Sequence, residues 1–313
     1  MRNKPTKGYI IKMRKIAVLK GGWSPERSIS IKSGENVANG FRKLGYDVYE
    51  IDVIKDLRYL TDELYKIDPD YVYNALHGIG GEDGVIQGLL EIFGKPYSNS
   101  NVLSSSLAFN KSIAKKIAKS AGVNTPHYID INQNELKNIS ANNPLISYPF
   151  VVKPCSNGSS IGVFVIHDKE DLKKLQKEEW IFGNNIIVEK YIDGREFTVL
   201  VIDSKAIGAV EILPKHEFYD YSSKYDEDGS RHIPNYNLEQ SRNANMYKMA
   251  EIVYNSCMCS GIARVDFRYD GIRPYFIEIN TQPGMTGVSL VPDIAEYSGM
   301  SFEDILEGSL KKL

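Results

Sequence analysis

The sequence predicts an α/β protein whose N-terminal third forms a parallel β-sheet covered by helices. Three short apolar strand patterns follow one another there: 16–19, 46–53 and 71–76. A helix-like pattern over 27–44 separates the first two, and Gly45 is typical of the residue that ends a helix. Alternation of strands and helices predicts a parallel sheet, and ligands bind such sheets beyond the carboxyl ends of their strands.

The remaining two thirds mix strand and helix patterns. Helices are expected over 104–120, 168–177 and 238–259. Short strand patterns dominate the middle of the chain: 150–153, 161–166, 186–189, 196–202 and 206–212. The polar, tyrosine-rich segment 214–235 is interpreted as a long surface loop, and a loop of that length in a compact domain is usually functional or disordered.

Composition excludes several classes of protein. A length of 313 residues suits two or three domains, and a net charge of −2 disfavours a nucleic-acid scaffold. Three cysteines argue against a secreted disulfide framework, and we interpret Cys257 and Cys259 as small buried apolar residues. We find neither a membrane-span pattern nor a signal peptide, so a cytoplasmic protein without membrane association is expected. Residues 1–12 are interpreted as an extension.

A polar hairpin pattern near the C-terminus contains a candidate metal site. Asp266 and Glu278 lie on the polar faces of two strand patterns joined by a turn near Gly271, so they are expected to face each other. With Asn280 they form an all-oxygen set suited to Mg²⁺ shared with nucleotide phosphates. The alternative is a solvated face on which Arg264 and Arg268 pair with the acids.

Two further segments are candidates for nucleotide binding. Lys153 ends a strand pattern before a loop of small residues reaching Gly162, where backbone N–H groups could approach an anion. The loop lacks the Walker A spacing, and an ordinary hairpin turn is the alternative. The connector 189–192 could hold an adenine through its backbone, with a carboxylate on the ribose; a plain linker is the default.

Two glycine-rich loops, 21–27 and 77–84, also follow strand patterns. Glu26 could hold an ammonium group, although an acid in the first turn of a helix is also favoured by the helix dipole. His77 could hold a carboxylate or have a structural role. Neither loop has the spacing of the dinucleotide fingerprint, which disfavours a nicotinamide dehydrogenase.

Taken together and in order, these motifs resemble those of the D-alanine–D-alanine ligases, within the ATP-grasp superfamily. The resemblance runs from about Lys15 to the C-terminus. Its motifs are Gly21-Gly22-x-Ser24-x-Glu26-Arg27, Leu76-His77-Gly78-x-Gly80-Gly81-Glu82-Asp83-Gly84, Lys153-Pro154 with Gly158-Ser159-Ser160-x-Gly162, Phe218-Tyr219-Asp220-Tyr221 with Lys224-Tyr225, Arg264-x-Asp266, and Glu278-x-Asn280-Thr281-x-Pro283-Gly284-Met285-Thr286. Cys155-Ser156-Asn157 departs from the usual phosphate loop, which raises the question of sensitivity to thiol reagents.

The resemblance implies an N-terminal Rossmann-like domain followed by a two-part ATP-grasp fold. We expect an N-terminal substrate-binding domain over 1–100, a central ATP-grasp subdomain over 101–190, and a C-terminal subdomain over 191–313. The last would carry the metal site and a lid formed by the 214–235 segment. A lid has a physical motive, because an acyl-phosphate must be protected from water.

The implied reaction is the ATP-dependent joining of two D-alanines through an acyl-phosphate, for peptidoglycan synthesis. The expected ATP-binding residues are Lys111, Lys153, Ser160, Glu189, Lys190, Ile192, Glu196 and Lys224. Two Mg²⁺ ions, replaceable by Mn²⁺, are expected on Asp266, Glu278 and Asn280.

The resemblance also assigns the residues around the reacting groups. Glu26 would bind the ammonium of the first D-alanine and would be linked to Ser159 and Tyr225. His77 would orient its carboxylate. The backbone N–H of Gly284 would stabilise the oxyanion together with Arg264. The second carboxylate is expected on Ser289 and Leu290.

A homodimer is implied as well. Other ATP-grasp ligases, such as D-alanine–D-lactate enzymes, and non-catalytic nucleotide-binding proteins remain the alternatives.

Overall fold

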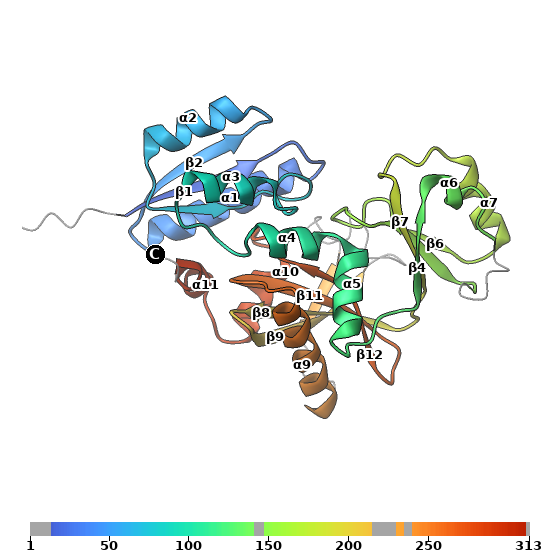
Figure 1. Cartoon of the computed structure of the whole chain (residues 1–313). Helices are drawn as coiled ribbons and strands as arrows, with labels where there is room; N and C mark the ends of the chain where they lie inside the picture. The colour runs from blue at the N-terminus through green and yellow to red at the C-terminus, as the bar shows by residue number, and fades with distance from the viewer. Residues whose placement is uncertain (1–13, 141–146, 215–229, 235–239, 311–313) are drawn as a thin grey trace, which may run out of the picture.

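The computed structural model of the chain describes residues 14–140, 147–214, 230–234 and 240–310. Three β-sheets organise it, as Figure 1 shows. The N-terminal and central sheets stand apart, and the C-terminal sheet lies between and below them. The three-domain division at residues 100 and 190 stays a prediction.

The N-terminal sheet is parallel, as the sequence predicts. Its strands are β1 (Lys15–Gly21), β2 (Asp47–Val53) and β3 (Tyr71–Asn74), in the order β2-β1-β3. Helix α1 (Arg27–Lys43) packs on one face, while α2 (Leu57–Ile67) and α3 (Val85–Phe93) pack on the other. Because β1 and β3 run in the same direction, the loops that follow them meet at one edge of the sheet.

The central sheet is antiparallel and has its own apolar core. Strands β4 (Tyr128–Asn132), β5 (Phe150–Pro154), β6 (Phe164–Ile166) and β7 (Asn185–Lys190) follow the order β4-β7-β5-β6. The short helix α6 (Gln133–Leu136) and α7 (Lys169–Lys177) accompany it. Phe150, Val152, Val188 and Trp180 are among its buried residues.

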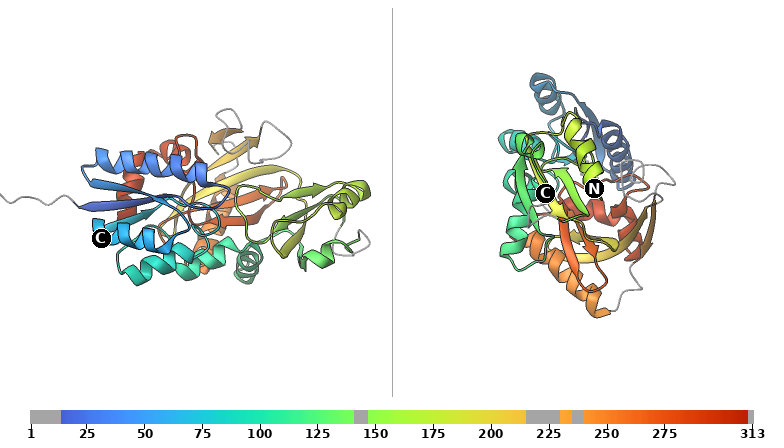
Figure 2. Two further views of the ribbon diagram at one scale, coloured as in Figure 1. Left: turned by 90° about the horizontal axis from the view of Figure 1, so that it is seen from above. Right: turned by 90° about the vertical axis from the view of Figure 1, so that its right-hand side faces the viewer.

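The C-terminal sheet is also antiparallel, with the order β10-β9-β8-β11-β12. Its strands are β8 (Arg195–Ile202), β9 (Lys205–Pro214), β10 (Ser230–Pro234), β11 (Ile262–Tyr269) and β12 (Pro274–Asn280). Helix α9 (Gln240–Ser256) covers its apolar face (Figure 2).

Helices α10 (Leu290–Tyr297) and α11 (Phe302–Ser309) join the C-terminal sheet to the N-terminal unit. One continuous apolar cluster contains Phe41 of α1, Leu200 of β8, Ile294 of α10 and Leu306 of α11. This shared core fixes the N-terminal loops over the C-terminal sheet, where the candidate site lies.

The single helix expected over 104–120 is wrong: the structure has α4 (Val102–Phe109) and α5 (Lys111–Ser120). Asn110 between them has extended backbone angles (φ −87°, ψ 101°), and its side chain accepts a hydrogen bond from the N–H of Ile113. An asparagine in this position is a favoured helix N-cap. The break lets the N–H of Lys111 donate to the carbonyl oxygen of Cys155 at 2.8 Å.

Two other sequence expectations need correction. Residues 230–234, assigned to a loop, form strand β10, which pairs with β9 at the edge of the sheet and carries Pro234 at its end, where proline is tolerated. Cys257 is buried as expected, whereas Cys259 is half-buried. The first residue of the expected loop, Pro214, ends β9, and 215–229 and 235 lie outside the described residues. Across the described ranges, we find no helix with the length and apolarity needed to cross a membrane.

Candidate active site

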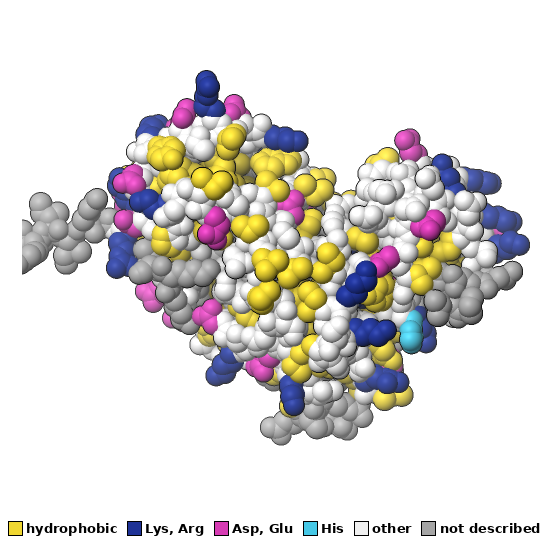
Figure 3. Space-filling model, viewed as in Figure 1, with side chains coloured by type: hydrophobic (Ala, Val, Ile, Leu, Met, Phe, Trp, Pro, Cys, Tyr) yellow, Lys and Arg dark blue, Asp and Glu magenta, His cyan; other side chains and the backbone are white. Residues whose placement is uncertain are grey.

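Two adjoining pockets lie on the polar face of the C-terminal sheet. The first is bordered by the N-terminal loops, α4 and the segment after β12; the second lies between the central and C-terminal sheets. They share Lys111, Asn157, Gly158 and Glu278 in their linings. Their cavity volumes are about 60 Å³ and about 130 Å³, so the second suits the larger ligand. Figure 3 shows the surface hollowed between the N-terminal and central units.

The candidate metal ligands face each other across the β11–β12 hairpin, as predicted. Asp266 pairs with Glu278, and Arg264 pairs with Asn280 in the next row of that polar face. Across the β8–β11 ladder, Thr198 donates a hydrogen bond to Asp266 at 2.5 Å and so orients that carboxylate. Two carboxylates and one amide oxygen therefore lie on one strand pair.

This donor set fits a magnesium ion that shares its coordination with phosphates. Within the described ranges, no group of three or more His, Cys, Asp or Glu side chains is arranged to hold a metal ion. Mg²⁺ commonly binds to one or two carboxylates and completes its shell with water and substrate phosphate oxygens. Asn280 Oδ1 accepts a hydrogen bond from the N–H of Gln282 at 2.8 Å, which fixes the amide orientation.

The alternative interpretation of the hairpin, in which Arg264 and Arg268 pair with its acids, holds for Arg264 and not for Arg268. Arg264 makes two contacts of 2.9 Å to the carboxylate of Asp266. Arg268 instead pairs with Glu196 of β8, and Lys111 lies 3.0 Å from Glu278. The face is not solvated in the ordinary sense, because Asp266 is buried and the row lies at the boundary between the two pockets.

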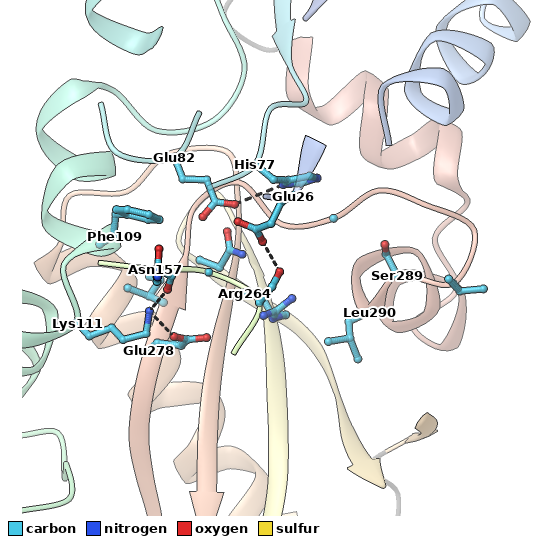
Figure 4. A pocket seen from close by; sticks show the side chains of 17 residues that line it. Glu26, His77, Glu82, Phe109, Lys111, Asn157, Arg264, Glu278, Ser289 and Leu290 are labelled. Carbon is cyan, nitrogen blue, oxygen red and sulfur yellow. Dashed lines mark hydrogen bonds and ion pairs between the residues drawn. The ribbon is translucent and has the colours of Figure 1, made fainter. Parts of the chain in front are cut away.

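Glu26 lies in the first pocket and is held by the central unit. It is the N-cap residue of α1, but its side chain makes no cap hydrogen bond and instead accepts one from the hydroxyl of Ser159, 133 residues away (Figure 4). Both residues are buried. The sequence-based link between Glu26 and Ser159 is thus present as a contact.

Two glycines let the backbone approach this carboxylate. A Cβ atom at Gly78 would lie 2.4 Å from Glu26 Oε2, and one at Gly158 would lie 2.7 Å from the same atom. Real Cβ atoms do not come so close, so both positions require glycine while Glu26 keeps this conformation. The carboxylate is enclosed by backbone from two loops.

His77 follows β3 and is held by three elements. Its Nδ1 lies 3.2 Å from the carbonyl oxygen of Gln282 and 3.4 Å from Glu82, both acceptors, so Nδ1 carries a proton. Nε2 then accepts a hydrogen bond from the hydroxyl of Ser33 at 3.1 Å. His77 lines the first pocket while it ties the N-terminal loop to the segment after β12.

The segment after β12 provides the far wall of the first pocket. Gly284, Ser289 and Leu290 all line it (Figure 4). The Ser289 hydroxyl lies 2.8 Å from that of Thr286 and accepts a hydrogen bond from the Thr286 N–H at 3.0 Å. The loop is thereby closed on itself before α10 begins.

The loop between β5 and β6 separates the two pockets. Ser159 and Ser160 have positive φ angles of 51° and 57°, which are uncommon for two successive residues other than glycine. Backbone strain of this kind is concentrated at ligand clamps and active sites. Ser160 lines the second pocket and Ser159 the first, so this strained turn contributes to both.

A buried group of charges underlies the second pocket. Glu189 of β7 lies between Lys153 of β5 and Lys115 of α5, with its Oε2 2.8 Å from Lys115 Nζ. Burial would raise the pKa of Glu189, but the two lysines hold it below its usual range. Burial lowers the pKa of Lys115 to about 8, although Glu189 opposes that shift.

Sequence reasoning missed Lys115. Its position four residues after Lys111 places both lysines on one face of α5, and that spacing was the available signal. Glu82, Thr198 and Arg268 were also missed as contributors to the site.

Three further residues that the sequence suggests for nucleotide binding line the second pocket. Lys190 and Ile192 line it from the connector after β7, and Glu196 lines it from β8. The side chain of Glu189 is engaged by the two lysines, and its backbone lies within β7, which pairs with β4 and β5. Lys224 and Tyr225 lie outside the described residues.

The architecture and the site define a class of protein. The second pocket lies between two sheets and is lined by lysines and by the paired carboxylates. The first pocket lies under the N-terminal α/β unit and adjoins it. This is the ATP-grasp arrangement, as the comparison with solved structures also indicates.

The family model described as D-ala D-ala ligase C-terminus matches residues 117–311. A D-alanine–D-alanine ligase of Parvibaculum lavamentivorans is 40% identical over 298 residues, covering 93% of this chain and 94% of its own. Among solved structures, the D-alanine–D-alanine ligase of Bacillus anthracis complexed with ATP has a TM-score of 0.82 and 32% identity, covering 95% of this chain and 96% of its own. A D-Ala:D-Ser ligase from Enterococcus faecalis has a TM-score of 0.80 and 27% identity, covering 96% and 99%. The chain belongs to the D-alanine–D-alanine ligase family.

Proposed function

We propose that this protein uses ATP to join two D-alanine molecules into D-alanyl-D-alanine through an acyl-phosphate. The observation that carries this proposal is the junction of the two pockets at Lys111 and Glu278. One pocket offers a buried carboxylate, Glu26, for an amino acid ammonium. The other offers Lys153 and a small-residue loop for phosphates. A phosphoryl group at the junction would be within reach of an amino acid carboxylate.

In the nucleotide pocket, Lys111 and Lys153 would contact phosphate oxygens. Ser160 and Lys190 would contact the nucleotide along the same pocket, and Lys224 would approach the γ-phosphate. The connector that runs from Glu189 to Ile192 would hold the adenine through its backbone, and the carboxylate of Glu196 would hold the ribose. Catalysis of phosphoryl transfer rests largely on such positioning and on charge neutralisation.

Asp266, Glu278 and Asn280 would hold two Mg²⁺ ions, with Mn²⁺ as a substitute. When bound, these ions offset negative charge on the phosphates. In this structure Arg264 contacts Asp266, and Lys111 contacts Glu278. The side chains of Arg264 and Lys111 would therefore change partners when the metal–nucleotide complex binds.

In the substrate pocket, Glu26 would bind the ammonium of the first D-alanine, with Ser159 and Tyr225 completing the hydrogen-bonded link. His77 would act on the first carboxylate mainly by holding the loops around it. The oxyanion formed during attack would be stabilised by Arg264 and the N–H of Gly284. Ser289 and Leu290 would hold the carboxylate of the second D-alanine.

The second substrate is the part of the reaction that the fold leaves open. A D-Ala:D-Ser ligase shares this fold at a TM-score of 0.80. A tyrosine at position 225 favours a second substrate that reacts as an amine, which supports D-alanine over D-lactate. The secondary candidate is therefore a ligase that takes another acid or amine as its second substrate.

We also propose a homodimer that acts in the cytoplasm in peptidoglycan synthesis. Val85 and Ile92 of α3 and Leu103 of α4 are exposed apolar side chains, with Ile92 90% exposed. Large apolar side chains exposed on neighbouring helices are candidates for a protein–protein contact. Ile92→Lys would lower the mass measured by light scattering from dimer to monomer; an unchanged mass would place the contact elsewhere.

The experiment that tests the reaction is phosphate release from ATP and Mg²⁺ in the presence of D-alanine, L-alanine, D-serine with D-alanine, or D-lactate with D-alanine. Release that requires D-alanine, with the dipeptide identified by mass spectrometry, supports the proposal. Release with only a mixed pair supports the secondary candidate. ATP binding without release would favour a non-catalytic nucleotide-binding protein.

A further inference from the structure

Arg268 lies in the nucleotide pocket but has none of the roles proposed above. It follows Asp266 by two residues on β11, so both side chains lie on the polar face of the sheet. Its strand partner on β8 is Glu196, the residue proposed to hold the ribose. Arg268 therefore lies at the end of the pocket away from the substrate compartment.

The guanidinium group of Arg268 joins three parts of the proposed adenosine site. Nε donates to the carbonyl oxygen of Ile192 at 3.2 Å, and one terminal nitrogen lies 3.3 Å from Glu196 Oε2. The other terminal nitrogen lies 3.4 Å from the hydroxyl of Tyr191, and the guanidinium carbon lies 5.5 Å from the centre of that ring. A single planar group thus contacts the connector and the carboxylate together.

The chemistry of arginine suits this task. Its donors are fixed in one plane, so contacts to a carbonyl, a carboxylate and an aromatic ring restrict all three partners at once. Glu196 is about a quarter exposed, and its contact with Arg268 limits the positions that its carboxylate can take. Holding its carboxylate in one place before the ribose arrives lowers the entropy lost on binding.

We propose that Arg268 is a positioning residue for ATP, which sets the connector at Ile192 and aims the carboxylate of Glu196 at the ribose hydroxyls. This inference rests on the proposed nucleotide site. It adds to that site a residue that contacts Glu196, the proposed acceptor for the ribose hydroxyls, and does not contact the phosphates. Arg268 acts through Glu196 and the connector and has no part in the transfer step.

The test compares binding of ATP and 2′-deoxy-ATP, each with Mg²⁺ and without D-alanine, by calorimetry. In Arg268→Met, Glu196 loses its ion pair with Arg268, so we expect ATP affinity to fall about tenfold and the preference for ATP over 2′-deoxy-ATP to shrink. Arg268→Lys keeps the charge without the planar fork and should lie between the two. A structural role alone would weaken both nucleotides equally.

The matched control is Arg195→Met. Arg195 lies on β8 beside Glu196, but its side chain pairs with Glu211 at 2.8 Å and is outside the pocket lining. Arg195→Met should leave the affinities for ATP and 2′-deoxy-ATP unchanged. A wild-type preference preserved in Arg268→Met and Arg268→Lys would overturn the inference. Wild-type protein that binds ATP but forms no dipeptide would instead remove the proposed reaction and leave this inference standing.

Discussion

The substrate and nucleotide compartments of this site are built in different ways. The substrate compartment collects single residues from separate parts of the chain: Glu26 follows β1, His77 follows β3, Ser159 lies between β5 and β6, and Arg264 lies on β11. Its contacts are hydrogen bonds and close backbone approaches. The nucleotide compartment lies between two sheets, and its foundation is a set of buried charges.

This difference indicates what each compartment is sensitive to. The first depends on how the N-terminal, central and C-terminal units are placed relative to one another. The second depends on electrostatics inside a low-dielectric interior, where ion pairs respond to pH and to the loss of a partner. Substitutions in the two compartments should therefore separate in the kinetic constant that they change.

The largest effect on kcat is expected for Arg264→Met, because Arg264 lines the substrate compartment. Removing one oxyanion donor typically costs about 10²–10³ in kcat, and we expect a loss in that range with little change in ATP affinity. Steady-state kinetics with D-alanine and calorimetry with ATP measure the two quantities. The control is Arg273→Met, since Arg273 is exposed at the hairpin and lines neither pocket. An unchanged kcat in Arg264→Met would remove the oxyanion role.

A smaller effect that is confined to the substrate compartment is expected for Gly78→Ala. The added methyl would lie 2.4 Å from Glu26 Oε2, so the carboxylate must move away from Ser159. Loss of that charged hydrogen bond should raise the KM for D-alanine about tenfold and leave the KM for ATP near its wild-type value.

Gly122→Ala is the control that distinguishes the effect of backbone strain from the effect of the close approach to Glu26. Gly122 has a φ of 81°, close to the 69° of Gly78, and no atom lies within 4 Å of a Cβ added there. Both variants should lose stability in urea unfolding, because alanine is strained at positive φ, and Gly78→Ala should lose more because its methyl also meets Glu26 and Ser24. If Gly122→Ala raised the KM for D-alanine as much as Gly78→Ala, the close approach to Glu26 would not be the cause.

The two compartments also differ in how well the sequence anticipates them. That Asp266 lies opposite Glu278 was predictable from the alternation of polar and apolar residues on both sides of the turn near Gly271, whereas the register shift between Asp266 and Phe267 that completes this pairing was not. The contact of Glu26 with Ser159 rests on the resemblance, since nothing local relates residues 133 apart.

Lys115 was not predicted because a lysine in a helix with several other lysines is typical of a solvated face. It is completely buried, and tertiary packing places it between the Phe276 carbonyl oxygen of β12 and the Glu189 carboxylate of β7. The break at Asn110 was missed for a related reason: besides the cap that Asn110 forms by accepting from the Ile113 N–H, the Lys111 N–H donates to Cys155, which is distant in the sequence.

Lys115→Met tests the buried charges of the nucleotide compartment. The pKa of Lys115 is lowered from 10.5 to about 8 by burial, so between these pH values the unfolded chain binds more protons than the folded one. Stability contributed at this position therefore rises with pH across that window and is lowest below pH 8. Relative to Lys115→Met, the wild-type free energy of unfolding should gain up to ~3 kcal/mol from pH 8 to 10.5.

Urea unfolding at several pH values measures this difference. Lys116→Met is the control, because Lys116 lies next in the same helix but is exposed and pairs with Asp130 at the surface. It should show no such slope relative to wild type. A flat difference between wild type and Lys115→Met would mean that Lys115 keeps its proton throughout, held by Glu189 more strongly than burial opposes it.

The smallest effect is expected at Cys155, which lies in the loop leading to Ser159 and Ser160. The side chain is 3% exposed, and burial raises the pKa of its thiol to about 11. Because the thiolate is the reactive form, both features protect it near neutral pH. Treatment of the native protein with iodoacetamide at pH 7.5 should leave dipeptide formation unchanged, with Cys155 unmodified by mass spectrometry. Rapid modification with loss of activity, suppressed by ATP, would show that the loop opens in solution and would bring Cys155 into the set of residues governing the nucleotide compartment.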